Sequence, residues 1–284
     1  MAITFQKATK AQIKARIALI GPSGSGKTYT ALRLCQALGE RIAVADTEFN
    51  SASLYSDRFT FDVVNLESFH HQTCIEVILA AESAAYDVLI IDSLSQFYIG
   101  RDGELDLVDK AAKRSQSQNS FAAWKEISPI HAKLMDAIMA AKLHILCTMR
   151  AKTEWVVELD ERTKKNVPRK VGTAPIMKDG SEYYFDLVCQ LSEDNTLMVT
   201  KSRCPALNGY VQHQAGEELG TAVKAWLTDG APMPDVSPTP QPAHPNGTGA
   251  TKSAAATQSQ GKPPRAPERP PGHPSRPQLT ELFR

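Results

Sequence analysis

The sequence has few aromatic residues, few cysteines and no long apolar run, and each shortage excludes a class of protein. Aromatic residues make up 7% of the 284 residues, which does not favour a β-sandwich or a lectin. The five cysteines are odd in number and separated in sequence, which argues against a disulfide framework or a zinc site and favours a reducing cytoplasm. The longest aliphatic runs are too short to cross a bilayer, and the N-terminus lacks a signal-peptide pattern. We therefore expect a cytoplasmic protein with no membrane partner.

An excess of charge of either sign is also missing. The 32 Lys and Arg residues are balanced by 31 Asp and Glu residues, which gives a formal net charge of +1. This balance excludes a wholly basic nucleic-acid coat protein and a wholly acidic tail protein. Any surface that binds nucleic acid must therefore be local.

Proline is distributed very unevenly. Of the 18 prolines, 13 lie between Pro232 and Pro277, in a stretch that has almost no aliphatic residues. Such a segment buries too little apolar surface to offset the entropy that is lost on ordering. We predict a folded core over residues 1–230 and a disordered, Pro-rich tail over residues 231–284. The tail ends in Leu279–Arg284, which is either a docking peptide or a terminus without a role.

Strands and helices alternate along the first part of the core. Apolar runs predict strands at residues 16–20, 42–46, 87–92 and 143–148, and a run of alternating character predicts another strand at residues 61–66. Helical periodicity predicts helices at residues 28–38, 73–85, 104–114 and 120–141, the last of them broken at Pro129. This order is typical of βαβ units, which form a mostly parallel sheet with helices on both faces.

The pattern changes after residue 150. Residues 153–159 and 167–171 flank a polar turn and predict a hairpin. Residues 183–191 and 197–201 predict two more strands, and residues 217–227 predict a closing helix. We therefore expect an α/β fold in which an antiparallel C-terminal extension joins the mostly parallel sheet.

A phosphate-binding loop is the strongest signal in the sequence. It follows the first predicted strand, precedes the first predicted helix and reads Gly21-Pro22-Ser23-Gly24-Ser25-Gly26-Lys27-Thr28. Glycines let the backbone curl so that its N–H groups point inward, and the helix N-terminus adds its positive dipole end. In P-loop ATPases the lysine lies between the β- and γ-phosphates. The loop therefore predicts that the protein binds ATP.

Two carboxylates further along the chain complete the predicted nucleotide site. Asp92 ends a strand of four aliphatic residues, and together with the Thr28 hydroxyl it is predicted to hold Mg²⁺. Glu48 comes two residues after the strand-ending Asp46 and is the best candidate to orient a water for hydrolysis. The alternative for Glu48 is a solvated acid in a loop.

The order of these motifs resembles that of RecA-type recombinase cores. The phosphate loop is followed by Asp46-Thr47-Glu48 and then by Ile90-Ile91-Asp92-Ser93, as in that family. The resemblance implies a RecA-like P-loop fold and a role for Glu48 as the catalytic base. RecA proteins carry a glutamine that senses the γ-phosphate at the place where this chain has Thr148, so the chain departs from the family there.

The chain looks closer still to the minimal RecA-like ATPases that phages encode as single-strand annealing proteins. This resemblance covers about residues 14–210 and is carried by the segments Asn119–Trp124, Thr148–Glu154 and Lys170–Pro175. It implies a core without flanking recombinase domains, which binds single-stranded DNA and promotes annealing during phage recombination. For a phage-encoded protein, the expected location is the cytoplasm of the bacterial host.

The segment Lys201-Ser202-Arg203 follows a predicted strand and resembles the basic fingers that hexameric helicases of the RecA superfamily insert into a neighbour's ATP site. Strand alternation puts Lys201 and Arg203 on one face. A guanidinium that reaches across an interface stabilises charge on the transferred phosphoryl group. The resemblance implies catalytic roles for both residues in a homo-oligomer, ring or filament, with ATP between subunits. The alternative is an exposed charge pair on an edge strand.

Basic residues are concentrated in the predicted hairpin. Between residues 162 and 170, five of nine residues are basic and none is acidic, and Trp155 is nearby for base stacking. Such a hairpin suits the backbone of single-stranded DNA, and the alternative is a solvated turn. The predicted DNA-binding residues are Arg150, Lys152, Arg162, Lys164, Lys165, Arg169 and Lys170.

Two other groups of residues carry plainer predictions. His70-His71 is interpreted as a loop pair and not as a metal site, because no third ligand follows at a suitable spacing. Tyr183-Tyr184-Phe185 is interpreted as the core and rim of a strand.

Together these features predict a slow, DNA-stimulated, Mg²⁺-dependent ATPase that oligomerises on single-stranded DNA and promotes strand annealing. A single-strand-binding protein is the candidate partner of the tail. Two alternatives stay open from the sequence. One is a nucleotide-gated module that binds a protein partner with little turnover, and the other is a ring-shaped DNA motor or helicase.

Overall fold

The computed structural model describes residues 13–114, 120–159 and 166–228, and for residues 153–159 and 166–171 it describes the backbone alone. The predicted tail, residues 231–284, lies outside the described residues. No helix in the described part of the chain has the length and apolar character that crossing a bilayer requires.

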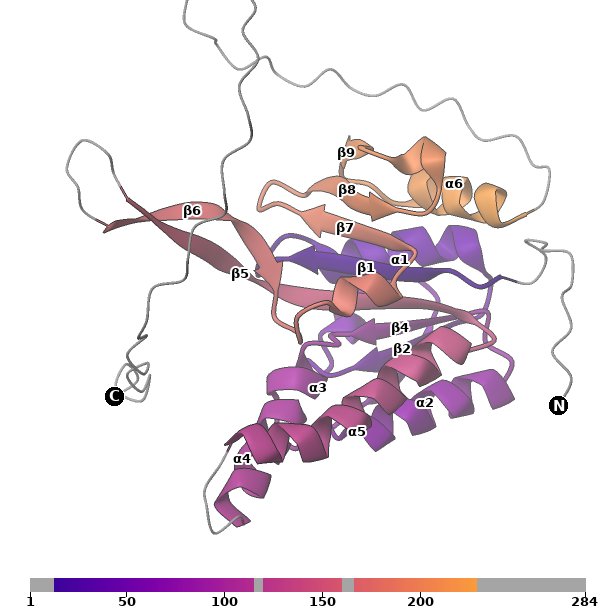
Figure 1. The fold of residues 1–284 in the computed structure, drawn as a ribbon. Coiled ribbons are helices and arrows are strands. Elements are labelled where there is room, and N and C mark those ends of the chain that lie inside the picture. The colour runs from indigo at the N-terminus through magenta and orange to yellow at the C-terminus, as the bar shows by residue number, and fades with distance from the viewer. Residues whose placement is uncertain (1–12, 115–119, 160–165, 229–284) are drawn as a thin grey trace, which may run out of the picture. The chain divides into compact units, whose positions relative to one another are not determined.

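A sheet of nine strands forms the centre of the described chain (Figure 1). The strands are β1 (Arg16–Gly21), β2 (Ile42–Asp46), β3 (Asp62–Asn65), β4 (Val88–Asp92), β5 (His144–Leu159), β6 (Asn166–Pro175), β7 (Leu187–Leu191), β8 (Thr196–Ser202) and β9 (Val211–His213). Their order is β3-β2-β4-β5-β1-β7-β8-β9, with β6 paired to β5 off this path. The pairs from β3 to β7 along the path are parallel, and the β7–β8, β8–β9 and β5–β6 pairs are antiparallel. The predicted α/β class and mostly parallel sheet are confirmed.

Helices cover both faces of this sheet, as Figure 1 shows. The helices are α1 (Lys27–Leu38), α2 (His71–Ser83), α3 (Gln96–Ile99), α4 (Glu104–Arg114), α5 (Ser120–Ala140) and α6 (Glu217–Leu227). Successive side chains of β1 point to opposite faces of the sheet, so one strand contributes to two hydrophobic cores. Ile17 and Leu19 pack in the cluster that contains α1 and α6, whereas Ala18 and Ile20 pack in the cluster that contains α2 and α5. Strands buried on both faces therefore appear in the sequence as continuous apolar runs.

Two predicted elements are wrong in detail. Helix α5 continues through Pro129 without a break, because Ile127 before the proline and His131 and Leu134 after it are buried on one face. Burial of this face outweighs the loss of one backbone donor at the proline. The predicted strand at residues 183–191 is instead a 3₁₀ turn, Ser181–Tyr184, followed by the shorter β7.

The 3₁₀ turn also corrects the interpretation of the aromatic run at residues 183–185. Gly180 precedes the turn with a φ of 83°, a left-handed conformation that favours glycine. Lys201 Nζ then donates to the carbonyl oxygens of Glu182, Tyr183 and Phe185, which keeps these groups out of a strand ladder. Tyr183 is consequently 73% exposed, while Phe185 is buried.

Candidate nucleotide-binding site

The carboxyl ends of the parallel strands bring the predicted nucleotide residues to one edge of the sheet. The register pairs Asp46 of β2 with Asp92 of β4. It also pairs Gly21, where β1 meets the phosphate loop, with Arg150 of β5. Ligands of open α/β sheets bind at this edge, where loops can be shaped around them.

The phosphate loop has the conformation that its glycines allow. Gly24 and Gly26 both have a φ of 79°, in the left-handed region that residues with a Cβ rarely adopt. A Cβ at Gly21 would come within 2.9 Å of the Leu191 carbonyl oxygen, so a side chain does not fit there. Among the described residues, none caps the N-terminus of α1 with a side chain, and its first turn holds no acid. The amides and the helix dipole are therefore available to an anion.

Lys27 is the cation of this loop. Its Nζ donates to the carbonyl oxygen of Pro22 at 2.8 Å. Burial lowers the pKa of Lys27, and the charges of Glu48 and Asp92 oppose this shift. A phosphate group would replace one neutral acceptor with a charged one, which strengthens the hydrogen bond.

Asp92 is buried between two hydroxyl groups. Thr28 Oγ1 donates to Asp92 Oδ2 at 2.6 Å, and Thr148 Oγ1 donates to Asp92 Oδ1. Burial raises the pKa of the Asp92 carboxyl, and the two hydrogen bonds oppose that shift. A hydroxyl and a carboxylate side by side are oxygen donors of the kind that Mg²⁺ prefers, so Thr28 and Asp92 fit the predicted metal. Thr148 thus lies on the carboxylate that would hold the metal.

Glu48 is positioned by its own turn and by an arginine from β5. Asp46 Oδ1 accepts from the backbone N–H of Glu48 at 2.6 Å, and Asp46 Oδ2 accepts from Ala52 at 2.9 Å, which fixes the turn after β2. Arg150 contacts Glu48 Oε1 with Nε at 3.0 Å and Nη2 at 2.9 Å. The sequence pattern predicted a DNA contact for Arg150 and gave no indication of this ion pair. One feature of the sequence could have indicated that Arg150 lies at the nucleotide site. Arg150 comes two residues after Thr148, so the two side chains lie on the same face of a strand.

A family described as AAA domain matches residues 13–222 of the chain, which include the phosphate loop, Asp92 and all nine strands. The chain belongs to this family of P-loop ATPases. Membership implies nucleotide binding, typically with Mg²⁺. No curated protein matches the sequence.

A pocket of about 620 Å³ adjoins the phosphate loop of this AAA domain. Its lining includes Tyr29, Arg33, Tyr55, Arg58 and Asn195, next to Gly24 and Gly26 of the loop. The rings of Tyr29 and Tyr55 lie 5.7 Å apart. Aromatic rings and a few polar groups beside a phosphate site are suited to a base and a sugar. This pocket was not predicted from the sequence, although Tyr29 directly follows the loop.

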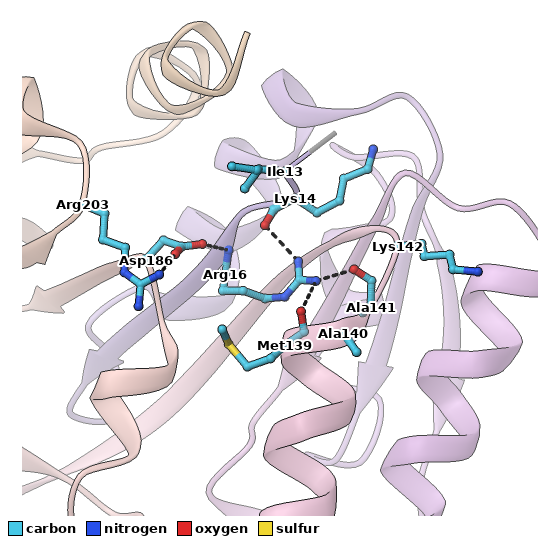
Figure 2. Close-up of a pocket in the computed structure, with 9 residues that line it drawn as sticks. All are labelled: Ile13, Lys14, Arg16, Met139, Ala140, Ala141, Lys142, Asp186 and Arg203. Atoms are coloured by element: carbon cyan, nitrogen blue, oxygen red, sulfur yellow. Dashed lines mark hydrogen bonds and ion pairs between the residues drawn. The ribbon is translucent and has the colours of Figure 1, made fainter. Parts of the chain in front are cut away.

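Lys201 and Arg203 lie at the opposite edge of the AAA domain's sheet from the phosphate loop. Residue Ser202 between them pairs with Leu187 at the start of β7, whereas Leu191 at the end of β7 contacts the loop. Arg203 lines a pocket of about 590 Å³, and its Nη1 lies 3.2 Å from Asp186 Oδ1. Figure 2 draws this ion pair as a dashed line. Lys201 is held by three backbone carbonyl oxygens, and burial lowers its pKa. The structure therefore brings neither residue to the phosphate loop of its own chain.

The predicted hairpin is confirmed as a backbone feature. Strands β5 and β6 pair from Ala151 with Pro175 to Leu159 with Asn166, and Lys152 at its base is exposed. Arg169 and Lys170 lie in β6, opposite Val156 and Trp155. Arg162, Lys164 and Lys165 lie outside the described residues.

Proposed function

We propose that this AAA domain protein is a RecA-type, Mg²⁺-dependent ATPase that assembles on single-stranded DNA and promotes strand annealing in phage recombination. The path of β5 carries the proposal. This strand passes Thr148 and Arg150 at the nucleotide site and continues without a break into the hairpin with β6 (Figure 1). Five of the nine residues between 162 and 170 are basic. One continuous strand thus joins the nucleotide site to the segment that we assign to DNA.

At the nucleotide end, each residue receives a role from its contacts. Lys27 would neutralise charge on the transferred phosphoryl group, and Thr28 and Asp92 would hold Mg²⁺. When bound, Mg²⁺ supplies charge neutralisation at the phosphate oxygens. Arg150 contacts Oε1 of Glu48 with two guanidinium nitrogens, so we assign Oε2 to the attacking water. The adjoining pocket with Tyr29 and Tyr55 would take the adenosine group.

The Glu48–Arg150 ion pair suggests how DNA would stimulate hydrolysis. Arg150 lies where β5 leaves the central sheet, and its side chain is 40% exposed. A DNA phosphate near the hairpin base offers a stronger anionic partner than one oxygen of Glu48. Transfer of Arg150 to DNA would release Glu48 to act on water. This step reconciles the predicted DNA contact of Arg150 with its contact in the structure.

The position of Arg203 supports an assembly with ATP between subunits. Because Arg203 lies at the far edge of the sheet from its own phosphate loop, it can act on ATP only in a neighbouring subunit. Its side chain is 53% exposed and is held by one carboxylate, Asp186. Lys201 is already held by three carbonyl oxygens, so we assign the finger to Arg203 and a supporting role to Lys201.

The test is ATP turnover with and without a single-stranded oligonucleotide, in the full chain and two variants. Wild-type turnover should rise with the oligonucleotide, and complementary strands should anneal faster in a fluorescence assay. Glu48→Gln should bind ATP but lose about 10²-fold or more in turnover, because the group that activates water is gone. Arg150→Gln should turn over faster without DNA and respond less to DNA. The control is Arg114→Gln, whose exposed pair with Glu126 lies in α4 and α5.

Three outcomes would contradict the proposal. Turnover that ignores DNA would indicate the nucleotide-gated, protein-binding module. Unwinding of a duplex would indicate the motor or helicase. An Arg150→Gln enzyme with the wild-type response to DNA would remove the proposed link between the hairpin and Glu48.

A further inference from the structure

Three side chains from three helices meet in a buried cluster that does not belong to the nucleotide site. His71 begins α2, Glu104 begins α4 and His131 lies in the middle of α5. Their exposed fractions are 1%, 0% and 5%. One possible ligand atom from each residue lies within 4.8 Å of the others. The interpretation of His70-His71 as a plain loop pair was wrong for His71, because its partners are distant in sequence.

Two buried polar atoms of this cluster, Glu104 Oε2 and His71 Nδ1, have no hydrogen-bond partner among the described residues. Glu104 Oε2 lies 2.7 Å from His131 Nδ1 and 3.8 Å from His71 Nε2. The first contact is short but misaligned and the second is too long, so Oε2 has no hydrogen-bond partner within the described chain. His71 Nδ1 is likewise buried without a partner among the described residues. Buried polar atoms without partners are rare in folded proteins, so Glu104 Oε2, which lies between the two imidazoles, calls for an explanation.

The other oxygen of Glu104 is occupied. Lys178 Nζ lies 3.3 Å from Glu104 Oε1 and 3.1 Å from Ser128 Oγ. Carboxylates that bind a metal through one oxygen are commonly held through the other in this way. The remaining oxygen, Oε2, faces the two imidazoles.

We propose that His71, Glu104 and His131 bind a divalent transition-metal ion of the Zn²⁺ type. Two imidazoles and one carboxylate are a characteristic zinc donor set, whereas Mg²⁺ prefers oxygen ligands alone. Zinc bonds of about 2.0–2.2 Å place tetrahedral ligand atoms roughly 3.3 Å apart. The separations of Glu104 Oε2 from His131 Nδ1 and His71 Nε2, 2.7 and 3.8 Å, lie on either side of that value. A water would supply the fourth ligand.

The ion would tie three helices together. Helices α4 and α5 lie in the chain between Asp92 and β5, so they connect two parts of the nucleotide site. Since the ion binds the folded chain and not the unfolded one, it raises the melting temperature. At a free concentration 100 times the dissociation constant, the expected rise is roughly 5–10 °C for a chain of this size.

The experiment uses the full chain without an affinity tag, stripped by a chelator and titrated with Co²⁺ and then Zn²⁺. One Co²⁺ per chain should bind with the visible absorption of a tetrahedral site, Zn²⁺ should displace it, and Zn²⁺ should raise the melting temperature. Glu104→Gln and His131→Gln should lose both the Co²⁺ absorption and the rise in melting temperature with Zn²⁺. The control His70→Asn should keep them, because asparagine retains the cap that His70 Nδ1 provides to the Gln72 N–H.

A variant with a different ligand keeps the test decisive even where the glutamine variants fold poorly. His131→Cys should still bind Co²⁺ and should add sulfur-to-cobalt charge-transfer absorption. Absence of a tetrahedral Co²⁺ spectrum in the wild-type chain would overturn the site. So would an unchanged spectrum in His131→Cys, which would place the ion on other residues, such as His244 or His273 of the tail.

Discussion

The two ends of β1 each place a cation, a buried Arg16 and a half-buried Lys27, and the two cations are held differently. Arg16 begins the strand and is 3% exposed. Its guanidinium donates to the carbonyl oxygens of Lys14, Ala15 and Leu143 and to those of Met139 and Ala141 at the end of α5 (Figure 2). Lys27 follows the other end of the strand and donates to one loop carbonyl, that of Pro22. Burial lowers the pKa of both residues.

The difference in partners separates a structural cation from a functional one. Arg16 spreads its charge over five carbonyl oxygens from three segments, so moving it would leave several buried acceptors unpaired. Within the described part of the chain, Lys27 has one neutral acceptor and lies beside loop amides that are open to an anion. The cation at the amino end of the strand, Arg16, therefore stabilises the fold. The cation after the carboxyl end, Lys27, is available to bind a ligand.

The largest effect that this comparison predicts is on turnover. Lys27→Met should lower ATP hydrolysis by about 10²–10³-fold, since one preorganised charge on the transition state is lost. Its free energy of unfolding should stay within about 1 kcal/mol of wild type, because only one hydrogen bond to a loop is removed. Phosphate release and urea unfolding measure the two quantities. Lys14→Met, at the amino edge, is the matched control and should keep wild-type turnover. Normal ATP hydrolysis in Lys27→Met would show that the phosphate loop is not part of the nucleotide site.

The next largest effect is a loss of stability without a loss of turnover, which is the reverse of the effect expected for Lys27→Met. Arg16→Met should lower the free energy of unfolding by about 3 kcal/mol, because the carbonyl oxygens at the end of α5 lose a charged donor. Turnover per folded molecule should be unchanged. Arg114→Met removes an exposed ion pair with Glu126 and should change stability by no more than about 0.5 kcal/mol. Equal urea midpoints for the two variants would show that Arg16 is not a structural cation.

The sequence predicted the carboxyl end of the sheet better than the amino end. Lys27, Thr28 and Asp92 follow strand ends in a local pattern, and parallel strands carry such residues to one edge. Arg16 gave no signal, because its partners Met139 in α5 and Leu143 just before β5 are more than a hundred residues away. The same limit hid the pairing of Glu48 with Arg150 and that of His71 with Glu104 and His131.

Local patterns also failed where a distant contact decided the local structure. The proline in α5 predicted a break, but packing on both sides of Pro129 kept the helix intact. The aromatic run at 183–185 predicted a strand, but Lys201 from β8 captured its carbonyl oxygens. In both cases the deciding partner comes from another part of the chain, which periodicity does not detect.

The smallest predicted effect concerns pH at the amino end. His144 Nδ1 accepts from the backbone N–H of Ala15 at 3.0 Å, next to Arg16. Burial, followed by the charges of Lys14 and Arg16, lowers the pKa of His144 from 6.5 to about 4. Between these two values His144 binds a proton in the unfolded chain but not in the folded chain. The free energy of unfolding therefore falls as the pH drops from 6.5 to about 4, and above 6.5 this loss is absent.

Protonation of His144 can lower the free energy of unfolding by roughly 3 kcal/mol at most. Contact of the side chain with solvent reduces this loss to about 1–2 kcal/mol. His144→Gln should therefore flatten the pH dependence of the urea midpoint in this window, because glutamine offers an acceptor that does not titrate. His213→Gln, at an exposed position in β9, should leave the slope as it is. If His144→Gln keeps the wild-type slope, the amino end does not hold its histidine neutral, and the contrast between the two ends of β1 rests on Arg16 alone.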